Sequence, residues 1–397
     1  MPPRIRIPID GKSAAWAILC AFLVFSWQSL TVRCNYGGNW TALFLTGGRL
    51  QIPPALANEH IYTFPGSMGW DGQFYHYIAH DPLMAHDLWK YIDAPRLRYR
   101  RILIPALAYA LACGNPVHVD TAYRAVILLF FALGAYWLSR LAARFGRRRA
   151  WGLAFLAIPA AIVSMDRMAV DVGLAALVMG FAWYSREEHP GWQLYPVLLL
   201  GALARDTGLL LVPAYCIWLL MHKRAWRAAA FATAAIPTLA WYGYIDLRTQ
   251  PFAHSGPIAI PFSGLLDRLL HAWPYPYSPG LRFALDGLDD LAVVGILLAI
   301  IMAMPLARHT GFSPSGWAMV LFALVGIFLW RPGDWLEAFD YARILSPLLA
   351  LVALETLPAF RWLMWAPLCM AAPRCLIQLA PQVLGVLRLA VKVAPPH

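Results

Sequence analysis

Charged residues are scarce in this chain of 397 residues: Asp, Glu, Lys and Arg together make up 13% of it, whereas 60% is hydrophobic. A soluble domain carries about 25% charged residues, so the composition excludes an ordinary soluble protein. Apolar runs near the ~20 residues that cross a bilayer recur along the chain. Because a helix satisfies its own backbone hydrogen bonds in hydrocarbon, such runs are helical. The sequence therefore predicts an all-α, polytopic transmembrane protein with a single integral-membrane domain, residues 1–397.

Cysteine is also sparse, and its placement gives no sign of a metal or redox motif. The six cysteines mostly lie inside apolar runs, with no CxxC pair and no His/Cys cluster at metal-binding spacing. They are typical of small core residues and leave the redox compartment undecided. They are Cys20, Cys34, Cys113, Cys216, Cys369 and Cys375.

Nucleotide-binding motifs are missing as well. The chain has no Walker A motif and no GxGxxG sequence followed by a soluble βαβ unit. Its net charge of +11 accompanies no soluble basic fold, so we expect no nucleic-acid partner. In a membrane protein, excess Lys and Arg instead marks cytoplasmic loops and contacts with anionic lipid headgroups.

The apolar runs predict about eleven membrane spans. The first, residues 14–32, follows Arg4, Arg6 and Lys12. It is long for the hydrophobic part of a signal peptide and lacks a small-x-small cleavage site, so we expect it to be retained as a span. The later runs are residues 121–143, 151–163, 168–184, 192–204, 207–221, 228–245, 291–306, 317–330 and 344–358, with a less regular pair within 361–393.

Two segments between the spans are much longer than ordinary connections. Residues 33–101 follow the first span, and we expect this outer loop 1 to carry juxtamembrane helices. Residues 246–290 are rich in Pro, Tyr and Asp, which suggests either a lid on the acceptor side of a site or a packed loop. Residues 102–113 are apolar but too short to cross a bilayer at about 1.5 Å per residue.

The basic clusters predict the orientation through the positive-inside rule. Placing residues 144–149 and 223–227, both rich in Lys and Arg, in the cytoplasm requires that residues 102–113 do not cross but form a re-entrant half-helix. This choice places the N-terminus in the cytoplasm and both long loops outside. The acidic residues test it independently, because Lys and Arg alone set the orientation. All but four of the 21 Asp and Glu residues then fall on the outer side.

Outer loop 1 contains a polar and aromatic stretch, residues 69–82. Gly72 follows Asp71 and permits unusual backbone angles or the close approach of a ligand. Rings such as Trp70 and Tyr75 suit the faces of sugars, although Trp and Tyr also gather at membrane interfaces without any catalytic role. Asp71 is therefore a candidate functional carboxylate, and an interfacial aromatic belt is the alternative.

His76 and His80 lie in the same stretch with i, i+4 spacing. On a helix they would share one face, where two imidazoles could bind a metal. Ordinary surface histidines are the simpler interpretation. The residues identify no cofactor, and a divalent cation is the one that stays open.

Four arginines crowd the end of outer loop 1, directly before the half-helix. Guanidinium groups bind phosphate oxygens in a bidentate manner, so the cluster suits a phosphate. Anchoring to lipid headgroups is the alternative. Because the positive-inside rule disfavours so many arginines outside, the cluster favours a specific anion. The four residues are Arg96, Arg98, Arg100 and Arg101.

Ionisable residues at the ends of spans form a third group, which includes Asp171, Arg205 and Asp206. Such residues are costly to insert into a membrane and usually mark a site or a charge pair. Neutralisation of Arg205 by a neighbouring Asp is the structural alternative. Arg343, at the outer start of a late span, is a further phosphate candidate, or an interfacial arginine that reaches the headgroups.

Without a nucleotide-binding domain, an enzyme on the outer face needs a donor that is already in the membrane, and polyprenyl-phosphate sugars meet this requirement. Together with the long outer loop after the first span, several short motifs resemble the GT-C class of integral-membrane glycosyltransferases. They also resemble uncharacterised bacterial membrane proteins tied to the formation of cell-surface glycopolymers. The motifs are Asp71-Gly72-Gln73-Phe74-Tyr75, Asp81-Pro82, Ile92-Asp93-x-Pro95, Tyr99-Arg100-Arg101-Ile102-Leu103-x-Pro105 and Arg205-Asp206-Thr207-Gly208-Leu209-Leu210.

This resemblance implies a GT-C-like fold and an enzyme that transfers a sugar from a polyprenyl-phosphate-linked donor to a glycan or lipid acceptor of the cell envelope. It implies that Asp71 is the general base, and a single displacement would invert the anomeric centre. It also implies a location in the bacterial inner membrane, in contact with membrane lipids and with the site facing outwards. The oligomeric state is not indicated.

The motif differs from the class in one respect, because many GT-C enzymes carry a pair of acids and here Gly72 follows Asp71. A second acid must therefore come from elsewhere. The candidates for it are Asp81, Asp93, Asp171 and Asp206. The candidates for binding the donor phosphate are Arg96, Arg98, Arg100, Arg101, Arg205 and Arg343. The candidates for contacting the substrates are Trp70, Gln73, Tyr75 and Tyr99.

Two other functions stay open at this point. A flippase or transporter of lipid-linked glycans would use the same arginines for phosphate and the acids within the membrane for coupling. It would line both halves of the bilayer with polar groups, whereas the acids here gather on one side. A polymerase or ligase of surface glycans would hold its essential residues in 246–290 rather than in outer loop 1.

Overall fold

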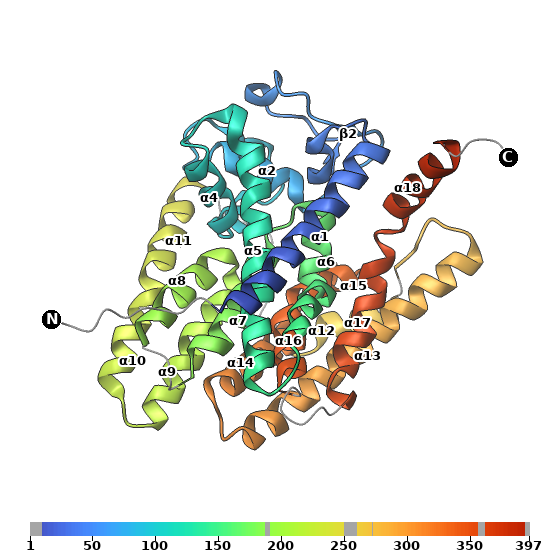
Figure 1. Ribbon diagram of the computed structural model, residues 1–397. Coiled ribbons are helices and arrows are strands. Elements are labelled where there is room, and N and C mark those ends of the chain that lie inside the picture. Colours follow the sequence, from blue (N-terminus) through green and yellow to red (C-terminus); the bar gives the residue numbers. More distant parts are fainter. Residues whose placement is uncertain (1–9, 187–190, 250–259, 272, 356–361, 394–397) are drawn as a thin grey trace.

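The computed structural model describes residues 10–186, 191–249, 260–271, 273–355 and 362–393. Within these ranges nearly all regular structure is helical (Figure 1). The only strands in them are β1 (Thr46–Gly47) and β2 (Thr63–Phe64), which pair in parallel inside outer loop 1. The predicted all-α class is therefore confirmed for the described part of the chain.

Three helices are long and apolar enough to cross a membrane: α1 (Gly11–Asn35), α5 (Pro116–Arg144) and α13 (Pro279–His309). With 25, 29 and 31 residues, each exceeds the ~20 residues that a bilayer requires. Two pairs of bent helices would raise the number of spans to five if each pair is one span. Among the described residues these are η4 (Arg149–Ala157) with α6 (Pro159–Arg167), bent by 68°, and α17 (Ala366–Ile377) with α18 (Ala380–Val393), bent by 48°.

The other helices are shorter, and four of them are apolar helices of 10 to 17 residues when a preceding 3-10 turn is included. The α-helices are α2 (Asp71–His80), α3 (Pro95–Tyr99), α4 (Leu103–Leu111), α7 (Asp171–Tyr184), α8 (Leu194–Ala204), α9 (Leu211–Met221), α10 (Ala225–Ala232), α11 (Ile236–Arg248), α12 (Ser263–Leu270), α14 (Pro314–Phe328), α15 (Ala338–Ile344) and α16 (Ser346–Leu354). The remaining 3-10 helices are η1 (Trp40–Phe44), η2 (Pro54–Leu56), η3 (Leu88–Tyr91), η5 (Gly191–Gln193), η6 (Asp206–Leu210), η7 (Thr233–Ala235), η8 (Pro332–Trp335) and η9 (Trp362–Met364).

Local sequence accounts for where the long helices begin. The Asp10 side chain accepts a hydrogen bond from the Lys12 amide at the start of α1, and Asn115 caps Val117 in the same way at the start of α5. Helix α13 starts at Pro279, in the first helical position that proline favours. It therefore begins twelve residues before the predicted span 291–306, inside the segment 246–290 that the sequence suggested was a loop.

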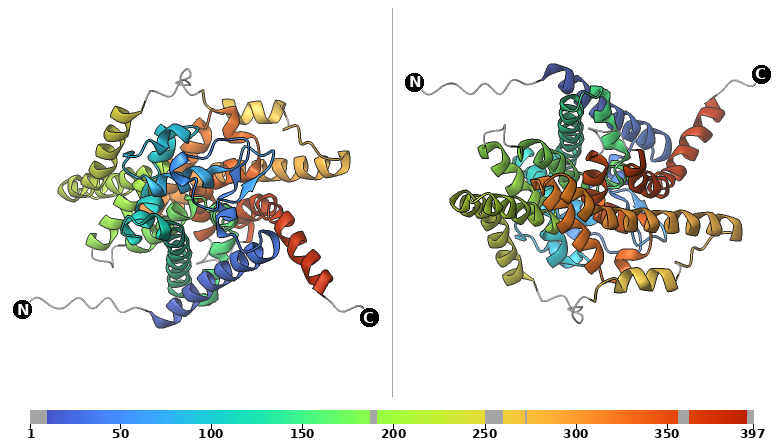
Figure 2. Two further views of the ribbon diagram at one scale, coloured as in Figure 1. Left: turned by 90° about the horizontal axis from the view of Figure 1, so that it is seen from above. Right: turned by 90° about the horizontal axis from the view of Figure 1, so that it is seen from below.

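The elements of outer loop 1 gather at one end of the molecule, and the connection between α9 and α10 lies at the other end (Figure 1). Residues 102–113 form helix α4, which packs on α2 and α5. Helix α1 packs along α5, and α13 packs along α17. Helices α10, α11 and α18 and the first part of α13 lie at the periphery when the molecule is viewed from above and below (Figure 2).

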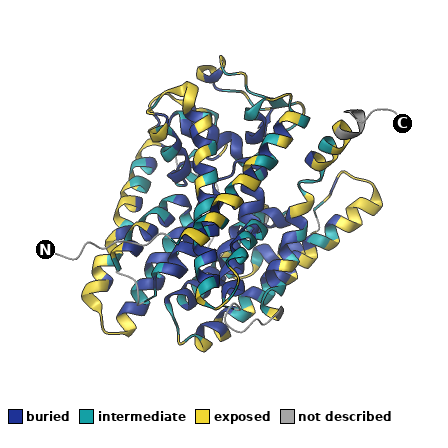
Figure 3. Cartoon of the chain, viewed as in Figure 1, coloured by how far each residue is buried: buried dark blue, intermediate teal, exposed yellow. Residues whose placement is uncertain are grey.

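Buried residues fill the centre of the helical assembly, and exposed residues follow its outer helices (Figure 3). Helix α1 buries Cys20 and Val24, while Ile18 and Phe22 on its other side are 69% and 61% exposed. An exposed apolar face of this kind suits contact with lipid. The structure thus supports a membrane protein with three to five candidate spans, and the count of about eleven stays a prediction.

The first turn of α2 is packed so closely that only glycine fits at position 72. A Cβ atom there would collide with the carbonyl oxygen of Arg167 and lie 2.9 Å from that of Phe44. Both neighbours are backbone atoms, which cannot move aside as a flexible side chain can. Glycine is therefore required at position 72 by close packing against the backbone of Arg167 and Phe44. This packing fixes the position of the neighbouring Asp71.

We expect Gly72→Ala to destabilise the protein by about 1–3 kcal/mol, the usual cost of overpacking. Thermal unfolding of the purified protein in detergent measures the effect. Gly243→Ala in α11 is the matched control, because a Cβ there meets nothing within 4 Å. The control should be neutral or stabilising by about 0.5–1 kcal/mol, since alanine favours a helix interior over glycine. Equal melting temperatures for the two variants would contradict the packing argument.

Candidate functional site

Asp71 is the first residue of α2, and Trp70 before it has an extended backbone. A carboxylate at this position interacts favourably with the positive end of the helix dipole. The Trp70 ring packs against Phe339 of α15, with 4.8 Å between the ring centroids, and the Arg167 guanidinium lies 3.6 Å from its centroid. The N-terminal end of α2 thereby contacts α6 and α15, which come from distant parts of the sequence.

Two arginines hold the Asp71 carboxylate, one on each oxygen. Arg98 Nη1 lies 2.7 Å from Oδ1, and Arg343 Nη1 lies 2.7 Å from Oδ2. The Asp71 side chain is only 16% exposed and those of the arginines 10%. Burial alone would raise the pKa of Asp71, but the charges of Arg343, Arg98 and Arg101 hold that pKa well below its usual range. Asp71 is therefore ionised at neutral pH.

The ion pairs continue beyond Asp71 in both directions. Arg98 donates to both oxygens of Asp93 at 3.0 and 2.9 Å. Arg343 donates to Asp340 at 3.2 Å and lies 3.7 Å from Asp171. Asp171 in turn forms an ion pair with Arg205, and both side chains are almost fully buried.

Arg101 extends the network on the side of α8 and η6. Its Nε lies 3.3 Å from Oδ1 of Asp206, and its Nη1 lies 3.3 Å from the hydroxyl of Tyr75. The Arg101 side chain is buried. The structure thus brings together Asp71, Tyr75 and Arg101 of outer loop 1 with Arg205 and Asp206 in one network.

A cavity of about 340 Å³ lies beside this network. Arg101 and Arg205 belong both to its lining and to the network around Asp71. Four arginines, two aspartates and a threonine form the polar part of the lining, and apolar side chains form the rest. The lining residues are Leu97, Arg100, Arg101, Arg205, Asp206, Thr207, Val325, Phe328, Leu329, Trp330, Arg331, Asp334 and Ile344.

Some guanidinium nitrogens at the cavity are buried without a hydrogen-bond partner among the described residues. Arg205 Nε and Arg100 Nε are of this kind, and so is Nε of the adjacent Arg343. Burying such a donor unpaired is costly, and native structures usually give it a partner. The site therefore has spare capacity for an anion.

Asp340 is the acid that the sequence analysis missed as a partner for Asp71. Asp340 shares Arg343 with Asp71. Burial raises the pKa of Asp340 to about 7; the Asp71 charge also raises this pKa, and the Arg343 charge lowers it. Asp340 and Arg343 are three residues apart on α15, so they share a helix face. That spacing indicated the pairing of Asp340 with Arg343, but not that both lie next to Asp71.

Several predicted site residues have other partners. Arg96 and Arg100 both pair with Asp246 of α11, at 2.5 and 3.3 Å, and only Arg100 of the two lines the cavity. Asp81 accepts hydrogen bonds from the Ala85 and His86 amides, where it holds the loop after α2.

Two predicted substrate contacts are engaged within the protein itself. The Gln73 side chain accepts from the Gly47 amide and donates to the Met68 carbonyl, so it ties α2 to β1. The Tyr99 hydroxyl donates to the Asp81 carbonyl at 3.0 Å and is fully buried. Both side chains stabilise the framework around Asp71.

A second buried network, which the sequence analysis did not identify, centres on Arg374 of α17. Its Nε lies 3.2 Å from Asp289 of α13, and its Nη2 donates to Tyr275 at 2.8 Å and to Glu337 at 3.0 Å. Asp289 also accepts at 2.8 Å from the amide of Ala338, which is the first residue of α15, the helix that carries Arg343. An arginine inside the apolar run 361–393 was the available signal.

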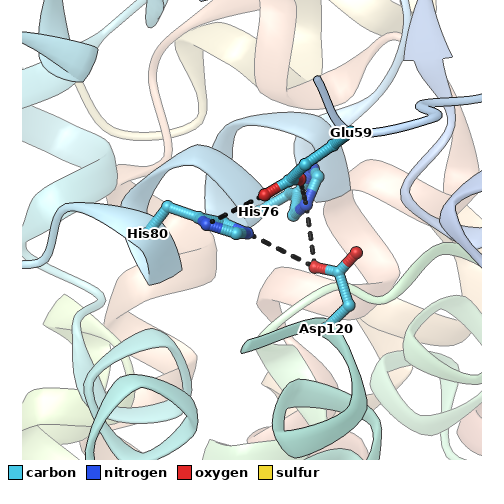
Figure 4. A group of neighbouring side chains, drawn as sticks. All are labelled: Glu59, His76, His80 and Asp120. Atoms are coloured by element: carbon cyan, nitrogen blue, oxygen red, sulfur yellow. Dashed lines mark hydrogen bonds and ion pairs between the residues drawn. The ribbon is translucent and has the colours of Figure 1, made fainter. Parts of the chain in front are cut away.

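His76 and His80 share one face of α2, as their spacing predicted, and Glu59 and Asp120 face them (Figure 4). The cluster is separate from the ion pairs of Asp71, which is at the other end of the helix. Comparisons of the chain with family models, curated proteins and solved structures found no match.

Proposed function

We propose that this protein is a glycosyltransferase of the GT-C type, which moves a sugar from a polyprenyl-phosphate-linked donor to a glycan or lipid acceptor. The observation that carries the proposal is the carboxylate of Asp71, held between Arg98 and Arg343 beside a cavity lined by further arginines. A base close to an anion site is what transfer from a phosphate-linked sugar needs.

The two kinds of lining suit the two parts of such a donor. Arg101, Arg205 and Arg331 offer charge to the phosphate, and their guanidinium groups match its oxygens. Phe328 and Trp330 belong to the apolar part of the wall, which suits an isoprenoid chain. A soluble sugar phosphate would have no use for that apolar surface.

The ion pairs of Asp71 suggest how the base is exposed. In the free enzyme Asp71 is a poor base, because Arg98 and Arg343 hold its pKa well below the usual range. A donor phosphate that takes hydrogen bonds from these arginines withdraws part of their charge from Asp71. The pKa of Asp71 then rises towards that of an ordinary carboxyl, which makes it a better base only when the donor is bound.

In the transfer step, the acceptor hydroxyl oxygen forms a bond to the anomeric carbon, and its proton passes to the Asp71 carboxylate. The bond between the anomeric carbon and the phosphate oxygen breaks, and polyprenyl phosphate leaves with the electron pair. Attack from the side opposite the phosphate inverts the anomeric centre. The arginines stabilise the charge that develops on the leaving phosphate.

Transport of a lipid-linked glycan is less well supported by the interior of the protein. A larger cavity of about 600 Å³ is lined by Arg144, Arg186 and Glu355 among others. Helix α7 begins at Asp171 in the network of Asp71, and Ser185 and Arg186, which follow its last residue, line this second cavity. Between these ends, residues 172–183 of α7 are buried and carry no ionisable side chain. A transporter would need a polar path there.

The proposal includes a location in the bacterial inner membrane, with about eleven spans, the N-terminus in the cytoplasm and Asp71 facing outwards. The basic segment that follows α5 and the one between α9 and α10 belong to the same end, because Arg144 and His222 line one cavity. Outer loop 1 occupies the opposite end (Figure 1). The separation of these two basic segments from outer loop 1 supports the proposed orientation.

Binding and turnover of a synthetic lipid donor test the proposal. Purified protein in nanodiscs is expected to bind polyprenyl phosphate and to release it from at least one member of a panel of polyprenyl-phospho-hexoses when envelope lipids are supplied as acceptors. Mass spectrometry follows the freed polyprenyl phosphate. Arg101→Gln should weaken binding by about tenfold or more, because a charged hydrogen-bond donor is worth about 1.5–3 kcal/mol.

Arg248→Gln is the control, since Arg248 is an exposed residue at the end of α11 and lies outside the cavity lining. It should bind polyprenyl phosphate as the wild type does. Tight binding with no turnover of any donor would favour transport instead. No binding of polyprenyl phosphate at all would reject the proposed donor.

A further inference from the structure

Four side chains that could bind a metal converge at the far end of α2 (Figure 4). His76 and His80 come from α2, Glu59 from outer loop 1 and Asp120 from the first turns of α5. One nitrogen or oxygen atom of each lies within 4.8 Å of one such atom of every other. The nearest pair is His76 Nε2 and Asp120 Oδ1, at 2.8 Å.

Hydrogen bonding inside the protein leaves this cluster incompletely satisfied. His76 is fully buried, and its Nε2 faces the carboxylates of Asp120 and Glu59 at 2.8 and 3.6 Å, whereas its Nδ1 has no hydrogen-bond partner among the described residues. The same holds for Oε2 of Glu59. The Phe44 ring stacks on the His76 imidazole, with centroids 4.3 Å apart, and fixes its orientation. A fully buried imidazole that is fixed in orientation and faces two carboxylates is arranged as a metal ligand would be.

The arrangement fits a divalent cation in charge and size. Two carboxylates and two neutral imidazoles carry a net charge of −2, which a divalent ion cancels. In a tetrahedral zinc site with bonds of about 2.0–2.2 Å, neighbouring donor atoms lie about 3.4 Å apart. His76 Nε2 lies 2.8 Å from Asp120 Oδ1 and 3.6 Å from Glu59 Oε2, and His80 Nε2 lies 3.5 Å from Asp120 Oδ1. Because one donor atom of each residue lies within 4.8 Å of the others, movements of about 1 Å would bring the four to tetrahedral spacing.

We infer that Glu59, His76, His80 and Asp120 form a binding site for a divalent transition metal such as Zn²⁺. The donor set of imidazole nitrogens and carboxylate oxygens is one that Zn²⁺ accepts, whereas Mg²⁺ and Ca²⁺ prefer oxygen ligands alone. With four protein ligands the coordination is complete, which is typical of a structural site. This inference does not depend on the proposed glycosyltransferase activity.

The metal would join three segments: the part of outer loop 1 that carries Glu59, helix α2 and the start of α5. Among the described residues, the charged side chains of these three segments contact one another only in this cluster. Helix α2 carries Asp71 at its first position and the two histidines in its second half. A cation there would therefore hold outer loop 1 against α5 and fix the helix that presents Asp71.

Metal analysis of the intact protein tests the site. Full-length protein purified without a polyhistidine tag and equilibrated with micromolar Zn²⁺ should retain about one equivalent after desalting, measured by inductively coupled plasma mass spectrometry. X-ray absorption at the zinc edge should show nitrogen and oxygen donors at about 2.0 Å and the multiple-scattering signature of two imidazoles. A strong chelator should lower the melting temperature of the wild type.

His80→Ala and the conservative variant Asp120→Asn should both lose the bound zinc and the melting shift on chelation. The control is His86→Ala in outer loop 1. The His86 side chain is 71% exposed and lies outside the cluster, so this variant should keep the bound zinc and the melting shift on chelation. If His80→Ala fails to fold, Asp120→Asn and the absorption spectrum of the wild type still decide. A wild type without zinc, a spectrum without imidazole donors, or zinc retained by folded Asp120→Asn would overturn the inference.

Discussion

Asp71→Asn is expected to reduce the rate of sugar transfer by about 10²–10⁴-fold, the contribution of a positioned general base. Asparagine has nearly the same shape, but its amide cannot take the proton of the acceptor hydroxyl. The measurement is the turnover rate with a polyprenyl-phospho-hexose at saturating donor. A folded Asp71→Asn protein with an unchanged rate would reject the role of Asp71.

The same variant should bind polyprenyl phosphate as tightly as the wild type, or more tightly. Arg98 and Arg343 each lose a charge partner at 2.7 Å when Asp71 is neutral, so they are freer to bind the phosphate. If Asp71→Asn loses turnover but keeps its affinity for polyprenyl phosphate, Asp71 acts as a base and not as a structural residue. Asp87→Asn is the matched control, because Asp87 is an exposed acid of the same loop that pairs only with Lys90 among the described residues.

Arg374→Met is expected to lower the free energy of unfolding by about 3–5 kcal/mol, the cost of removing one partner of a buried ion pair. Arg374 is 2% exposed and Asp289 is fully buried, so solvent cannot take over the lost interaction. The substitution would also leave Glu337 and the Tyr275 hydroxyl without their arginine partner. Thermal unfolding in detergent gives the difference from the wild type.

A double variant distinguishes an unpaired charge from lost packing. Adding Asp289→Leu to Arg374→Met removes the buried carboxylate, so the pair should cost less than the sum of the two single variants. Arg388→Met serves as the control, since Arg388 is exposed on α18, and it should stay within about 0.5 kcal/mol of the wild type. Strict additivity in the double variant would mean that the ion pair contributes little.

The helical class could be predicted from composition, because apolar runs of this length have no other stable structure in a bilayer. The number of spans does not follow from composition in the same way. Residues 149–167 and 366–393 each form a pair of helices with a sharp bend, and α7, α8, α9 and α14 are short apolar helices. Run length alone does not show whether such pieces cross a membrane, re-enter it or lie within the protein.

The arginine cluster shows what local periodicity would have added. Arg98 and Arg101 are three residues apart and face the Asp71 network, whereas Arg96 and Arg100 are four apart and face Asp246. Residues at these spacings share a face on a helical segment. The sequence analysis treated 96–101 as one cluster, because it did not recognise that α3 begins at Pro95.

Long-range partners were beyond prediction from one sequence. The i, i+4 spacing of His76 and His80 placed them on one helix face, but nothing local connected them with Glu59 or Asp120. Asp340 is a similar case, since only the packing of Phe339 of α15 against Trp70 brings that helix to the start of α2. Each of these contacts depends on the tertiary arrangement of helices that are far apart in sequence.

The pairing of Asp71 with Arg98 and Arg343 also has a consequence for biosynthesis. Arg98 is synthesised soon after Asp71, but Arg343 follows only after most of the chain has been made. At ordinary elongation rates of about 5–20 residues per second, the second arginine is added roughly 15–50 s after the carboxylate that it holds. The nascent protein therefore carries outer loop 1 through most of its insertion without a complete site, and the last third of the polypeptide finishes it.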